Sequence, residues 1–451
     1  MAIMECGHIA VFAFPFGTHA APLFNLVQRL AMASPNTIFS FFSTRQSNKS
    51  IFSDQKHEMI KPFDVEDGLP ENYVFKGNPQ EPVELFIRAT PHNFKRSLQV
   101  AVDERKREIS CIISDAFLWF CQEIAAEMCV PWIPLWTGGP FSLTSHIYTD
   151  IIRETFADKR PEDCEKEPLE FISGMSQISA KDLPEGILFG NLETEFPLLL
   201  HSMARTLPKA TAVAINSFEE IEETIAKDLK TKFNKFLNVG PLTLTSSTDE
   251  PASDDNGCLS WLSNQKPASV AYISFGSIIT PPPKEVVALA EALEKSGFPF
   301  LWSVRGNTKD FLPEGFLERT ADKGKVVPWA PQKGVLAHKS VGVFVTHCGW
   351  NSICESIVGG VPMICRPFFG DQKLNTKVLE DVWGIGLGVK DCVIAEDNMI
   401  SVLERIILQE EGKKMREKLR NFKGLAETAV GPNGSSTENF KTLVEIVTAT
   451  K

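Results

Sequence analysis

The feature that most restricts the fold of this chain is a regular alternation of short apolar runs with longer segments of helical periodicity. Residues 8–14 (HIAVFAF) and 37–44 (TIFSFFST) are typical of buried strands, and residues 22–33 between them repeat apolar positions with the period of a helix. The order of strand, helix and strand returns over residues 111–136. Strands that alternate with helices form parallel sheets, so the sequence predicts an α/β fold.

The alternation continues in the second half of the chain, with strands predicted at residues 270–277 (VAYISFGS) and 341–347 (VGVFVTH). Residues 243–257 between the halves are rich in Ser, Thr, Asp, Pro and Gly, which is the composition of a linker. With 451 residues, the chain is also too long for one ordinary core. We therefore predict two doubly wound, Rossmann-like domains, residues 1–242 and 258–431, that face each other across a cleft.

The charge and the cysteines narrow the classes of partner. A formal net charge of −11 gives neither nucleic acid nor an anionic membrane an attractive surface. The N-terminal residues lack the basic start and the cleavage pattern of a signal peptide, and no apolar run reaches the ~20 residues that span a bilayer. The ten cysteines are scattered and include no C-x-x-C pair, which favours reduced thiols. We expect a cytoplasmic monomer with small-molecule substrates.

Residues 329–372 combine strand-forming, glycine and polar residues in one run (WAPQKGVLAHKSVGVFVTHCGWNSICESIVGGVPMICRPFFGDQ). Within it, the predicted strand 341–347 passes through HCGWNS into a helix. The N-terminus of a helix binds phosphate readily, because its N–H groups and its dipole attract negative charge. His347, Asn351 and Ser352 could add side-chain donors, although Asn and Ser are also common helix N-caps.

Four further side chains of this run suit the other parts of a nucleotide sugar. Trp329 could stack on a base or pack in the core. Glu355, one turn into the helix, could accept hydrogen bonds from paired ribose hydroxyls or lie on a solvated surface. Asp371 and Gln372 follow a strand and a turn, and a carboxylate beside an amide matches neighbouring sugar hydroxyls.

In this order and spacing, the run resembles the signature box of the plant secondary-product UDP-glycosyltransferases, a family with the GT-B fold. The resemblance implies that Trp329 stacks on the base of a UDP-sugar and that Gln332 and Glu355 bind its ribose. It implies that the diphosphate is bound by His347, Asn351 and Ser352. The sugar is then contacted by Trp350, Asp371 and Gln372. Ala330, Ser277 and Thr137 complete the predicted UDP-sugar contacts.

The likeness covers nearly the whole chain and is to the flavonoid 3-O-glucosyltransferase branch of that family. Its segments are FAFPFGTHAAPL (12–23), GNPQEPVELF (77–86), ISDAFLWF (113–120), WTGGPFSLTSH (136–146), ISFGSIITPPP (273–283) and GPNGSSTENF (431–440). The resemblance implies transfer of glucose from UDP-glucose to the 3-hydroxyl of a flavonol or an anthocyanidin. The alternative is a glycosyltransferase for another plant phenolic or another UDP-sugar. We also expect residues 432–451 to form a C-terminal helix that packs back on the N-terminal domain.

His19 follows the first strand, in a loop where α/β domains present ligand-binding residues, and a neutral imidazole is the usual base near pH 7. On position alone it could also be a loop histidine without a role. Asp115 ends a buried strand before a predicted helix, so it could cap that helix or orient His19. The resemblance implies a catalytic pair of His19 and Asp115, in which the carboxylate stabilises the imidazolium formed when the acceptor loses its proton.

The sequence contains no D-x-D motif, so the usual metal clamp of other nucleotide-sugar transferases is not predicted. The negative charge of the departing phosphate must then be stabilised by the N-terminus of the helix, by His347 and by Ser277. We expect a single in-line displacement, in which the acceptor oxygen attacks the anomeric carbon opposite UDP and an α-linked donor becomes a β-glycoside. We expect no metal and no cofactor beyond UDP-glucose as co-substrate.

The aromatic content is almost wholly apolar, with 32 Phe against 3 Tyr, and most of these rings belong in the core. A few rings near the catalytic pair and the signature box could form a flat slot for a polyphenol; the candidates are Phe16, Phe117, Phe368 and Phe369. The resemblance adds polar side chains that select the acceptor, namely Gln80, Thr137 and His146.

Two other functions fit parts of the pattern. Doubly wound domains often bind dinucleotides, but no predicted strand is followed by G-x-G-x-x-G, and residues 384–389 (GIGLGV) have the wrong spacing. A non-catalytic protein that binds a nucleotide sugar or a flavonoid could have the same fold. The presence of both His19 and Asp115 favours the enzyme.

Overall fold

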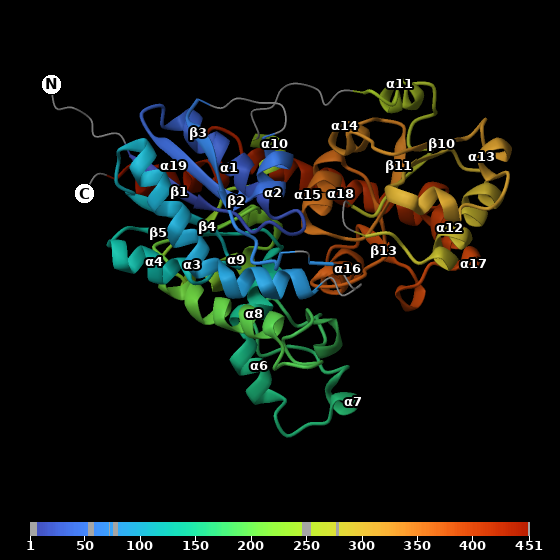
Figure 1. Cartoon of the computed structure of the whole chain (residues 1–451). Coiled ribbons are helices and arrows are strands. Elements are labelled where there is room, and N and C mark those ends of the chain that lie inside the picture. The colour runs from blue at the N-terminus through green and yellow to red at the C-terminus, as the bar shows by residue number, and fades with distance from the viewer. Residues whose placement is uncertain are drawn as a thin grey trace. The chain divides into compact units, whose positions relative to one another are not determined.

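The computed structural model describes residues 7–52, 58–71, 73–74, 80–245, 254–276 and 279–449. The chain divides into two compact units (Figure 1). Unit 1 comprises Met1–Pro161, Glu185–Ser247 and Ala429–Lys451, and unit 2 comprises Glu162–Pro184 and Thr248–Thr428. None of the helices within the described ranges combines the length and the apolar character that crossing a bilayer requires.

Within the described part of unit 1, seven strands form a parallel sheet in the order β3-β2-β1-β4-β5-β6-β7. The strands are β1 (His8–Phe12), β2 (Ile38–Thr44), β3 (Ile60–Val65), β4 (Cys111–Asp115), β5 (Trp132–Trp136), β6 (Val213–Ile215) and β7 (Phe236–Asn238). The strand order reverses between β1 and β4, which pair from Ile9↔Cys111 to Phe12↔Ser114. The loops that follow these two strands therefore lie beside each other, where doubly wound sheets bind ligands.

Helices connect the strands of unit 1 along both faces of its sheet. They are α1 (Ala20–Ala33), α2 (Arg45–Ile51), α3 (Gln80–Arg105), α4 (Cys121–Met128), α5 (Pro140–Ile147), α6 (Thr149–Thr155), α8 (Glu195–Thr206), α9 (Glu223–Lys232), α10 (Leu242–Thr245) and α19 (Ser435–Thr448). Short 3₁₀ turns occupy Leu207–Lys209 and Glu219–Ile221, and α7 (Pro161–Cys164) lies where the two units meet in sequence.

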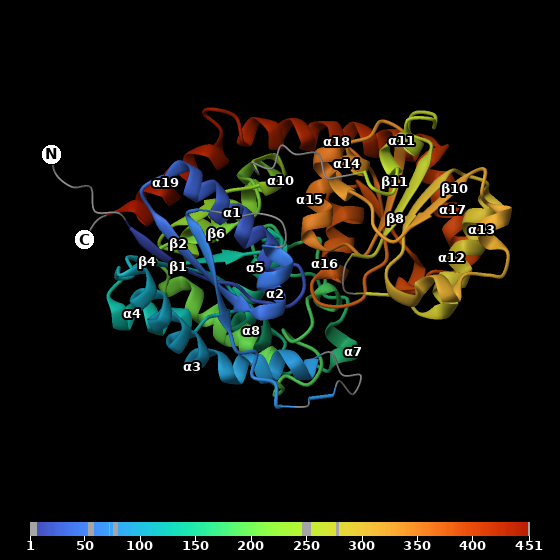
Figure 2. The same cartoon turned by 45° about the horizontal axis from the view of Figure 1, so that its top comes forward.

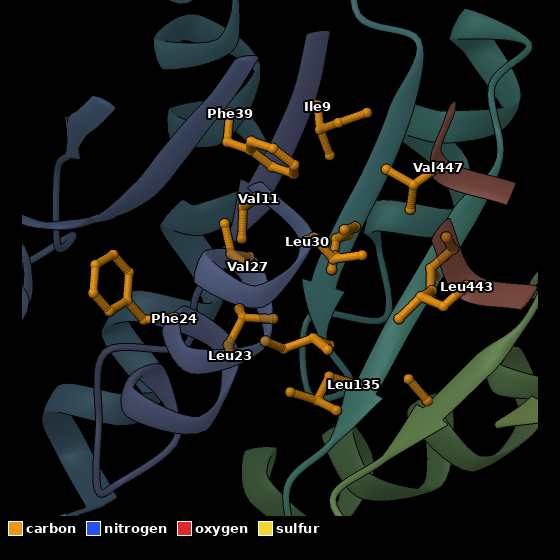
Figure 3. Close-up of a cluster of buried hydrophobic side chains, with 14 of the residues drawn as sticks. Ile9, Val11, Leu23, Phe24, Val27, Leu30, Phe39, Leu135, Leu443 and Val447 are labelled. Atoms are coloured by element: carbon orange, nitrogen blue, oxygen red, sulfur yellow. The ribbon is translucent and has the colours of Figure 1, made fainter. Parts of the chain in front are cut away.

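The core of unit 1 includes the C-terminal helix. Ile9 and Leu30, from β1 and α1, are fully buried in one apolar cluster, and Leu443 and Val447 of α19 belong to the same cluster. Figure 3 shows the side chains of Leu443 and Val447 pointing toward the same strands as Leu30. The guanidinium of Arg29 lies 3.7 Å from the ring centroid of Phe440 and adds a cation–π contact. The last helix is therefore part of the unit that holds the first strand.

Within the described part of unit 2, six strands form a parallel sheet in the order β10-β9-β8-β11-β12-β13. They are β8 (Val270–Ser274), β9 (Phe300–Ser303), β10 (Gly324–Val327), β11 (Val341–Thr346), β12 (Met363–Cys365) and β13 (Gly386–Gly388). Here the order reverses between β8 and β11, so this pair takes the place that β1 and β4 have in unit 1. Two parallel, doubly wound sheets confirm the predicted fold class.

The helices of unit 2 lie on both faces of its sheet. They are α11 (Cys258–Leu262), α12 (Pro283–Ser296), α13 (Phe316–Arg319), α14 (Gln332–Leu336), α15 (Trp350–Gly359), α16 (Gln372–Lys377), α17 (Glu396–Ile407) and α18 (Glu410–Ala429). Shorter turns occupy Ala180–Asp182, Gly306–Phe311 and Lys390–Cys392, and a π turn spans Val378–Val382.

Side chains of β8 alternate between these two layers. Ile273 packs in the apolar cluster with residues of α12 and α17, whereas Tyr272 bonds to α14 on the opposite face. Figure 2 shows α12 and α17 on one side of the strands and α14 and α15 on the other. This period of two follows from the strand geometry, and it directs Tyr272 toward the helices that carry the signature box.

The domain boundaries are less simple than the linker composition indicates. Residues 162–184 fall within the predicted first domain, 1–242, but they group with unit 2, where Lys373 Nζ of α16 donates to Lys181 O over 2.8 Å. Of the predicted linker 243–257, residues 246–253 lie outside the described residues. In its last part, Asp254 accepts from the backbone N–H of Leu259 over 3.1 Å, in the first turn of α11.

Candidate active site

In unit 1, His19 and Asp115 meet at the reversal of the strand order. His19 closes the loop after β1, Asp115 is the last residue of β4, and His19 Nδ1 lies 2.9 Å from Asp115 Oδ2. The Asp115 side chain is 1% exposed and that of His19 is 22% exposed. A carboxylate only accepts, so Nδ1 carries the proton and Nε2 keeps the lone pair. The pair can therefore act as an oriented base.

Asp115 does not cap the helix that follows it. Sequence analysis predicted a helix over 116–128, but α4 begins at Cys121 and its N-cap is Phe120. Asp115 Oδ1 instead accepts from the backbone N–H of Phe117 over 2.9 Å, within a turn. Both carboxylate oxygens thus receive a donor, which compensates for the burial of the charge.

Thr137 adds a third group to this pair. It follows β5 directly, and its Oγ1 lies 3.0 Å from His19 Nδ1. Sequence analysis assigned Thr137 to the UDP-sugar and to the acceptor, without predicting a contact with His19. The imidazole follows β1, and the adjacent strands β4 and β5 each bring one polar side chain to it.

Aromatic rings surround His19. The ring centroid of Phe117 lies 4.7 Å and that of Phe14 lies 5.1 Å from the imidazole. Phe16 packs against Phe14 at 5.3 Å and against Phe86 of α3 at 5.5 Å. Phe16 and Phe117 were predicted, but Phe14 and Phe86 were not. Phe14 lies in segment 12–23 and Phe86 in segment 77–86, so the resemblance of these segments to the family was the sequence signal that could have identified both rings.

Two predicted acceptor residues lie on the helices of unit 1. His146 of α5 is buried edge-on against Trp136, with 5.6 Å between the ring centroids. Burial lowers the pKa of His146 to about 4, and its Nδ1 has no hydrogen-bond partner in the described part of the chain. The ring is therefore neutral, with one nitrogen unused. Gln80 begins α3, but its side chain lies outside the described residues.

In unit 2, His347 lies between two glycines after β11. A Cβ on Gly276, whose φ is +80°, would lie 2.9 Å from His347 Cε1, and a Cβ on Gly349 would lie 2.5 Å from Nε2. Burial lowers the pKa of His347 to about 4, and its Nδ1 lacks a partner among the described residues. A neutral imidazole is thus held closely beside the start of α15. Ser277, which follows Gly276, lies outside the described residues.

The first turn of α15 has no side-chain cap, although Asn and Ser are common N-caps. Its N-cap is Gly349, with no side-chain cap, so Asn351 and Ser352 lie inside the helix. The alternative that these two residues serve as N-caps is therefore wrong. Trp350 begins the helix, and its buried indole lies 6.4 Å from the ring centroid of Trp383. The positive end of the helix dipole faces the same loop as His347.

Gln332 of α14 links the predicted ribose-binding groups. Its Nε2 donates to Glu355 Oε2 over 2.7 Å and to Ser352 Oγ over 3.0 Å. Burial raises the pKa of Glu355, whereas the Gln332 donor lowers it. Glu355 is therefore not a solvated surface residue. Tyr272, whose hydroxyl donates to Gln332 Oε1 over 3.2 Å, was missed, because an apolar strand gives no sign of which hydroxyl it directs to a helix.

Trp329 is exposed, so the alternative that it packs in the core is wrong. It lies two residues beyond β10, its side chain is 53% exposed, and the Arg305 guanidinium lies 4.6 Å from its ring centroid. The adjacent Ala330 is buried. Trp329 lines a hollow of about 450 Å³ together with Val304, Arg305, Gly306, Lys309 and Pro328. Its face therefore suits a flat ligand.

Gln372 begins α16 and is 5% exposed. Its Oε1 accepts from the backbone N–H groups of Phe368 and Phe369, over 2.8 and 3.3 Å. The amide oxygen is therefore occupied by backbone donors, and Asp371 precedes Gln372 as the helix N-cap. Asn375 fixes the helix, since its Nδ2 donates to Cys348 O over 3.0 Å and ties α16 to the loop after β11.

The two predicted acceptor rings of unit 2 differ in their surroundings. Phe368 lies edge-on to Phe275, with 5.8 Å between the ring centroids. The Arg366 guanidinium lies 3.8 Å from the centroid of the Phe368 ring. Phe368 thus packs against the core of unit 2. Phe369 is exposed and available to a ligand. Among the described residues, no group of three His, Cys, Asp or Glu side chains is arranged to hold a metal ion.

Known proteins resemble the chain along nearly its full length. Residues 46–422 match the family described as "UDP-glucoronosyl and UDP-glucosyl transferase". The chain is 54% identical to an anthocyanidin 3-O-glucosyltransferase of Vitis vinifera, over 98% of both chains. It is 51% identical to an anthocyanidin 3-O-galactosyltransferase of Actinidia chinensis var. chinensis, over 98% of this chain and 97% of the relative. The crystal structure of a UDP-glucose: anthocyanidin 3-O-glucosyltransferase in complex with UDP aligns with a TM-score of 0.94 and 42% identity, covering 99% of this chain and 100% of the other.

Proposed function

Because the chain belongs to the family of UDP-glucoronosyl and UDP-glucosyl transferases, we propose that it transfers glucose from UDP-glucose to the 3-hydroxyl of a flavonol or an anthocyanidin. It has the GT-B fold, with two parallel doubly wound sheets. It is a flavonoid 3-O-glycosyltransferase, in keeping with full-length relatives that act at this oxygen. The finer assignments concern the sugar and the residues that carry the reaction.

The observation that carries the reaction is the hydrogen bond of 2.9 Å between His19 Nδ1 and Asp115 Oδ2. His19 Nε2 takes the proton of the acceptor hydroxyl while the acceptor oxygen forms its bond to the anomeric carbon. Asp115 remains ionised and stabilises the resulting imidazolium, as the acid of a catalytic triad does. A base positioned in this way accelerates a reaction by about 10²–10⁴-fold.

The bond that breaks joins the anomeric carbon to a β-phosphate oxygen, and its electron pair leaves with UDP. The N-terminus of α15 and the neutral His347 receive this charge, with Asn351, Ser352 and Ser277 as further donors. Attack from the face opposite UDP inverts the α-linked donor into a β-glycoside. No step in this scheme requires a metal ion or a cofactor.

The base and the ribose of UDP are assigned to the other end of the signature box. Trp329 stacks on uracil, because its exposed face borders a hollow of about 450 Å³, and Ala330 lies beside it. Glu355 accepts from the ribose hydroxyls through the oxygen that Gln332 leaves unused. These assignments place the nucleotide along α14 and α15.

The sugar is assigned from the orientation of the Gln372 amide. Its oxygen is held by two backbone N–H groups, so the amide can only donate to the sugar, and Asp371 beside it can only accept. This pair matches the equatorial hydroxyls of glucose. An axial hydroxyl, as in galactose, would leave a buried group without its partner. Overall identity does not decide the sugar, because glucosyl and galactosyl relatives are about equally similar.

The acceptor is assigned to the aromatic rings around His19. A flat polyphenol can stack between rings such as Phe16 and Phe117, whose neighbours are already edge-on to one another. His146 and Gln80 are the proposed polar selectors, and Thr137 holds the imidazole that faces the reacting hydroxyl. Phe369 of unit 2 is exposed, and its assignment to the acceptor stays a prediction.

We further propose that the enzyme acts as a monomer in the cytoplasm. Each group assigned to the donor and to the acceptor belongs to one chain, so no second copy has to complete the site. Every cysteine in the described part of the chain is a free thiol, which is typical of a reducing compartment. Size-exclusion chromatography with light scattering tests the oligomeric state.

A product analysis tests the function. The purified chain is incubated with UDP-glucose and a panel of flavonols, anthocyanidins and other plant phenols, and each product is identified by mass spectrometry and NMR. We expect a single β-glucoside at the 3-oxygen of a flavonol or an anthocyanidin. Glucosylation at another hydroxyl, an α-linkage, or binding of both ligands without transfer would each overturn a stated part of the proposal.

A further inference from the structure

A hydrogen-bonded chain of four side chains runs from the centre of the unit 2 sheet to the proposed ribose site. Tyr272 of β8 donates its hydroxyl to Gln332 Oε1 over 3.2 Å. Gln332 Nε2 donates in turn to Ser352 Oγ and Glu355 Oε2 of α15, over 3.0 and 2.7 Å. The sheet is thereby connected to two residues of the donor-binding helix through one amide.

Tyr272 is held rigidly at the start of this chain. Its side chain is 1% exposed, and its ring is stacked on that of Phe344 in the neighbouring strand β11, with 5.0 Å between centroids and 17° between planes. A ring held in this way costs little further entropy when its hydroxyl forms a hydrogen bond. The hydroxyl therefore gives Gln332 a fixed partner.

The hydrogen-bonding capacity of Gln332 is nearly exhausted by protein groups. A primary amide has two N–H donors and two acceptor lone pairs. Both donors are used, by Ser352 and Glu355, and one lone pair accepts from Tyr272. A flipped amide would turn its oxygen toward the Glu355 carboxylate, which repels it. Gln332 can thus offer a ribose hydroxyl at most one lone pair.

From this arrangement we infer that Tyr272 is a positioning residue for donor binding, and that Gln332 acts mainly as the link through which Tyr272 aligns Ser352 and Glu355. This inference rests on the proposed UDP-sugar function of unit 2. Ser352 and Glu355 then meet the diphosphate and the ribose in one fixed geometry. The ribose hydroxyls donate to Glu355 Oε1, since the Gln332 donor occupies the other oxygen, Oε2.

The alignment also affects the ionisation of Glu355. Burial raises its pKa, and the Gln332 donor and the charge of Lys333 in α14 oppose that shift. The other titratable groups that face it are the Tyr272 hydroxyl of β8 and the Cys354 thiol of α15, whose own pKa values burial raises. UDP binding requires the ionised carboxylate, so it weakens as pH falls through the raised pKa. A misaligned Gln332 donor moves this midpoint to higher pH.

The test is Tyr272→Phe, which keeps the stacked ring and removes only the hydroxyl. Loss of one such hydrogen bond should raise the KM for UDP-glucose and the Kd for UDP by about 2- to 12-fold, with kcat nearly unchanged. Calorimetric titration with UDP from about pH 5 to pH 8 should show the binding midpoint displaced upward. The matched control is Tyr148→Phe, because that hydroxyl bonds to Asp228 in unit 1 over 3.0 Å and should leave UDP binding unchanged.

A double variant separates positioning from a structural effect. If Tyr272 acts through Gln332, Tyr272→Phe should add almost nothing to the loss already caused by Gln332→Ala. Fully additive losses, or a Tyr272→Phe protein whose KM and pH midpoint equal those of the wild type, would overturn the inference. Absence of UDP binding by the wild-type chain would instead overturn the proposed function, so the two failures are distinct.

Discussion

Each unit brings a histidine to the point where its strand order reverses, and the two histidines have opposite surroundings. His19 follows the first strand of unit 1 and lies 2.9 Å from the carboxylate that ends the neighbouring strand. His347 follows β11, the strand of unit 2 that takes the place of β4 in unit 1. It lies between Gly276 and Gly349, and its Nδ1 has no partner among the described residues. Burial without a counter-charge lowers the pKa of His347 to about 4.

The difference shows how one sheet order can serve two kinds of chemistry. A buried carboxylate that accepts from one imidazole nitrogen leaves the other nitrogen free to take a proton, as a general base requires. An imidazole packed between glycines at the start of a helix stays neutral. It can donate its N–H to a phosphate beside the positive end of the helix dipole without changing its own charge. We therefore expect substitutions in unit 1 to change kcat and substitutions in unit 2 to change donor binding.

The largest expected effect is that of His19→Ala. Removal of the base should lower kcat by about 10²–10⁴-fold, whereas the KM for UDP-glucose should change little, because the donor groups belong to unit 2. Asp115→Asn should lower kcat as well, since His19 and the Phe117 N–H donate to different carboxylate oxygens and the amide replaces one of these acceptors with an NH₂ donor. Steady-state kinetics with both substrates varied checks this.

A second His–Asp pair of unit 1 provides the control. His201 Nε2 lies 2.6 Å from Asp150 Oδ1 at a more exposed position, and neither residue is assigned to the reaction. His201→Ala should retain wild-type kcat. If His19→Ala kept near wild-type turnover as well, unit 1 would not contain the base and the comparison of the two histidines would fail.

The next largest effect concerns the sugar. A mismatched buried hydroxyl costs about 1–3 kcal/mol, so kcat/KM for UDP-glucose should exceed that for UDP-galactose by roughly 5- to 150-fold. Gln372→Ala should narrow this ratio by lowering the glucose rate, and Gln372→Glu should narrow it too, because the carboxylate cannot donate. Competition between both donors at equal concentration, with the product sugars identified, measures the ratio. Preferential formation of a galactoside would contradict the role of Gln372.

A smaller effect is expected from the cation stacked on Trp329. Arg305 lies 4.6 Å from the ring centroid, and a partly exposed cation–π contact is worth about 0.5–1 kcal/mol. Arg305→Ala should therefore raise the KM for UDP-glucose by about 2- to 5-fold and leave kcat unchanged. Arg305→Lys should recover part of the loss. A change in kcat alone would mean that Arg305 does not act through the base-stacking ring.

No effect is expected from chelation. The scheme meets the leaving charge with α15 and His347, so excess chelator should leave the initial rate within error of the untreated enzyme. A loss of activity that added Mg²⁺ or Mn²⁺ restores would show that unit 2 needs a counter-ion that His347 does not replace.

The alternation of strands and helices was enough to predict both sheets, because parallel strands require long crossover connections with strong periodic signals. The position of His347 and Gly349 in the turn between a strand and a helix was also predictable, because these residues lie close together in the chain. The helix after Asp115 was placed five residues too early, since the apolar run AFLWF continues without a break into α4. A turn and a helix start look alike in such a run.

Contacts that depend on the face of a strand or the orientation of an amide were not predictable. Tyr272 looks like one more apolar strand residue, and its role appears only when α14 is packed on the same face. Gln372 was assigned to the sugar without an orientation of its amide, and in the structure two backbone N–H groups donate to its oxygen. Thr137 was assigned to the substrates, and its closeness to His19 depends on β5 pairing beside β4.

The most direct test of the difference between the two histidines is the affinity of UDP for His19→Ala and His347→Ala, measured side by side by calorimetry. Loss of a hydrogen bond to a charged phosphate costs about 1.5–3 kcal/mol, so His347→Ala should bind UDP about 10- to 150-fold more weakly than the wild type. His19→Ala should bind UDP as the wild type does. Wild-type affinity in the His347 variant, or an equal loss in both variants, would contradict the division of catalysis and donor binding between the two units.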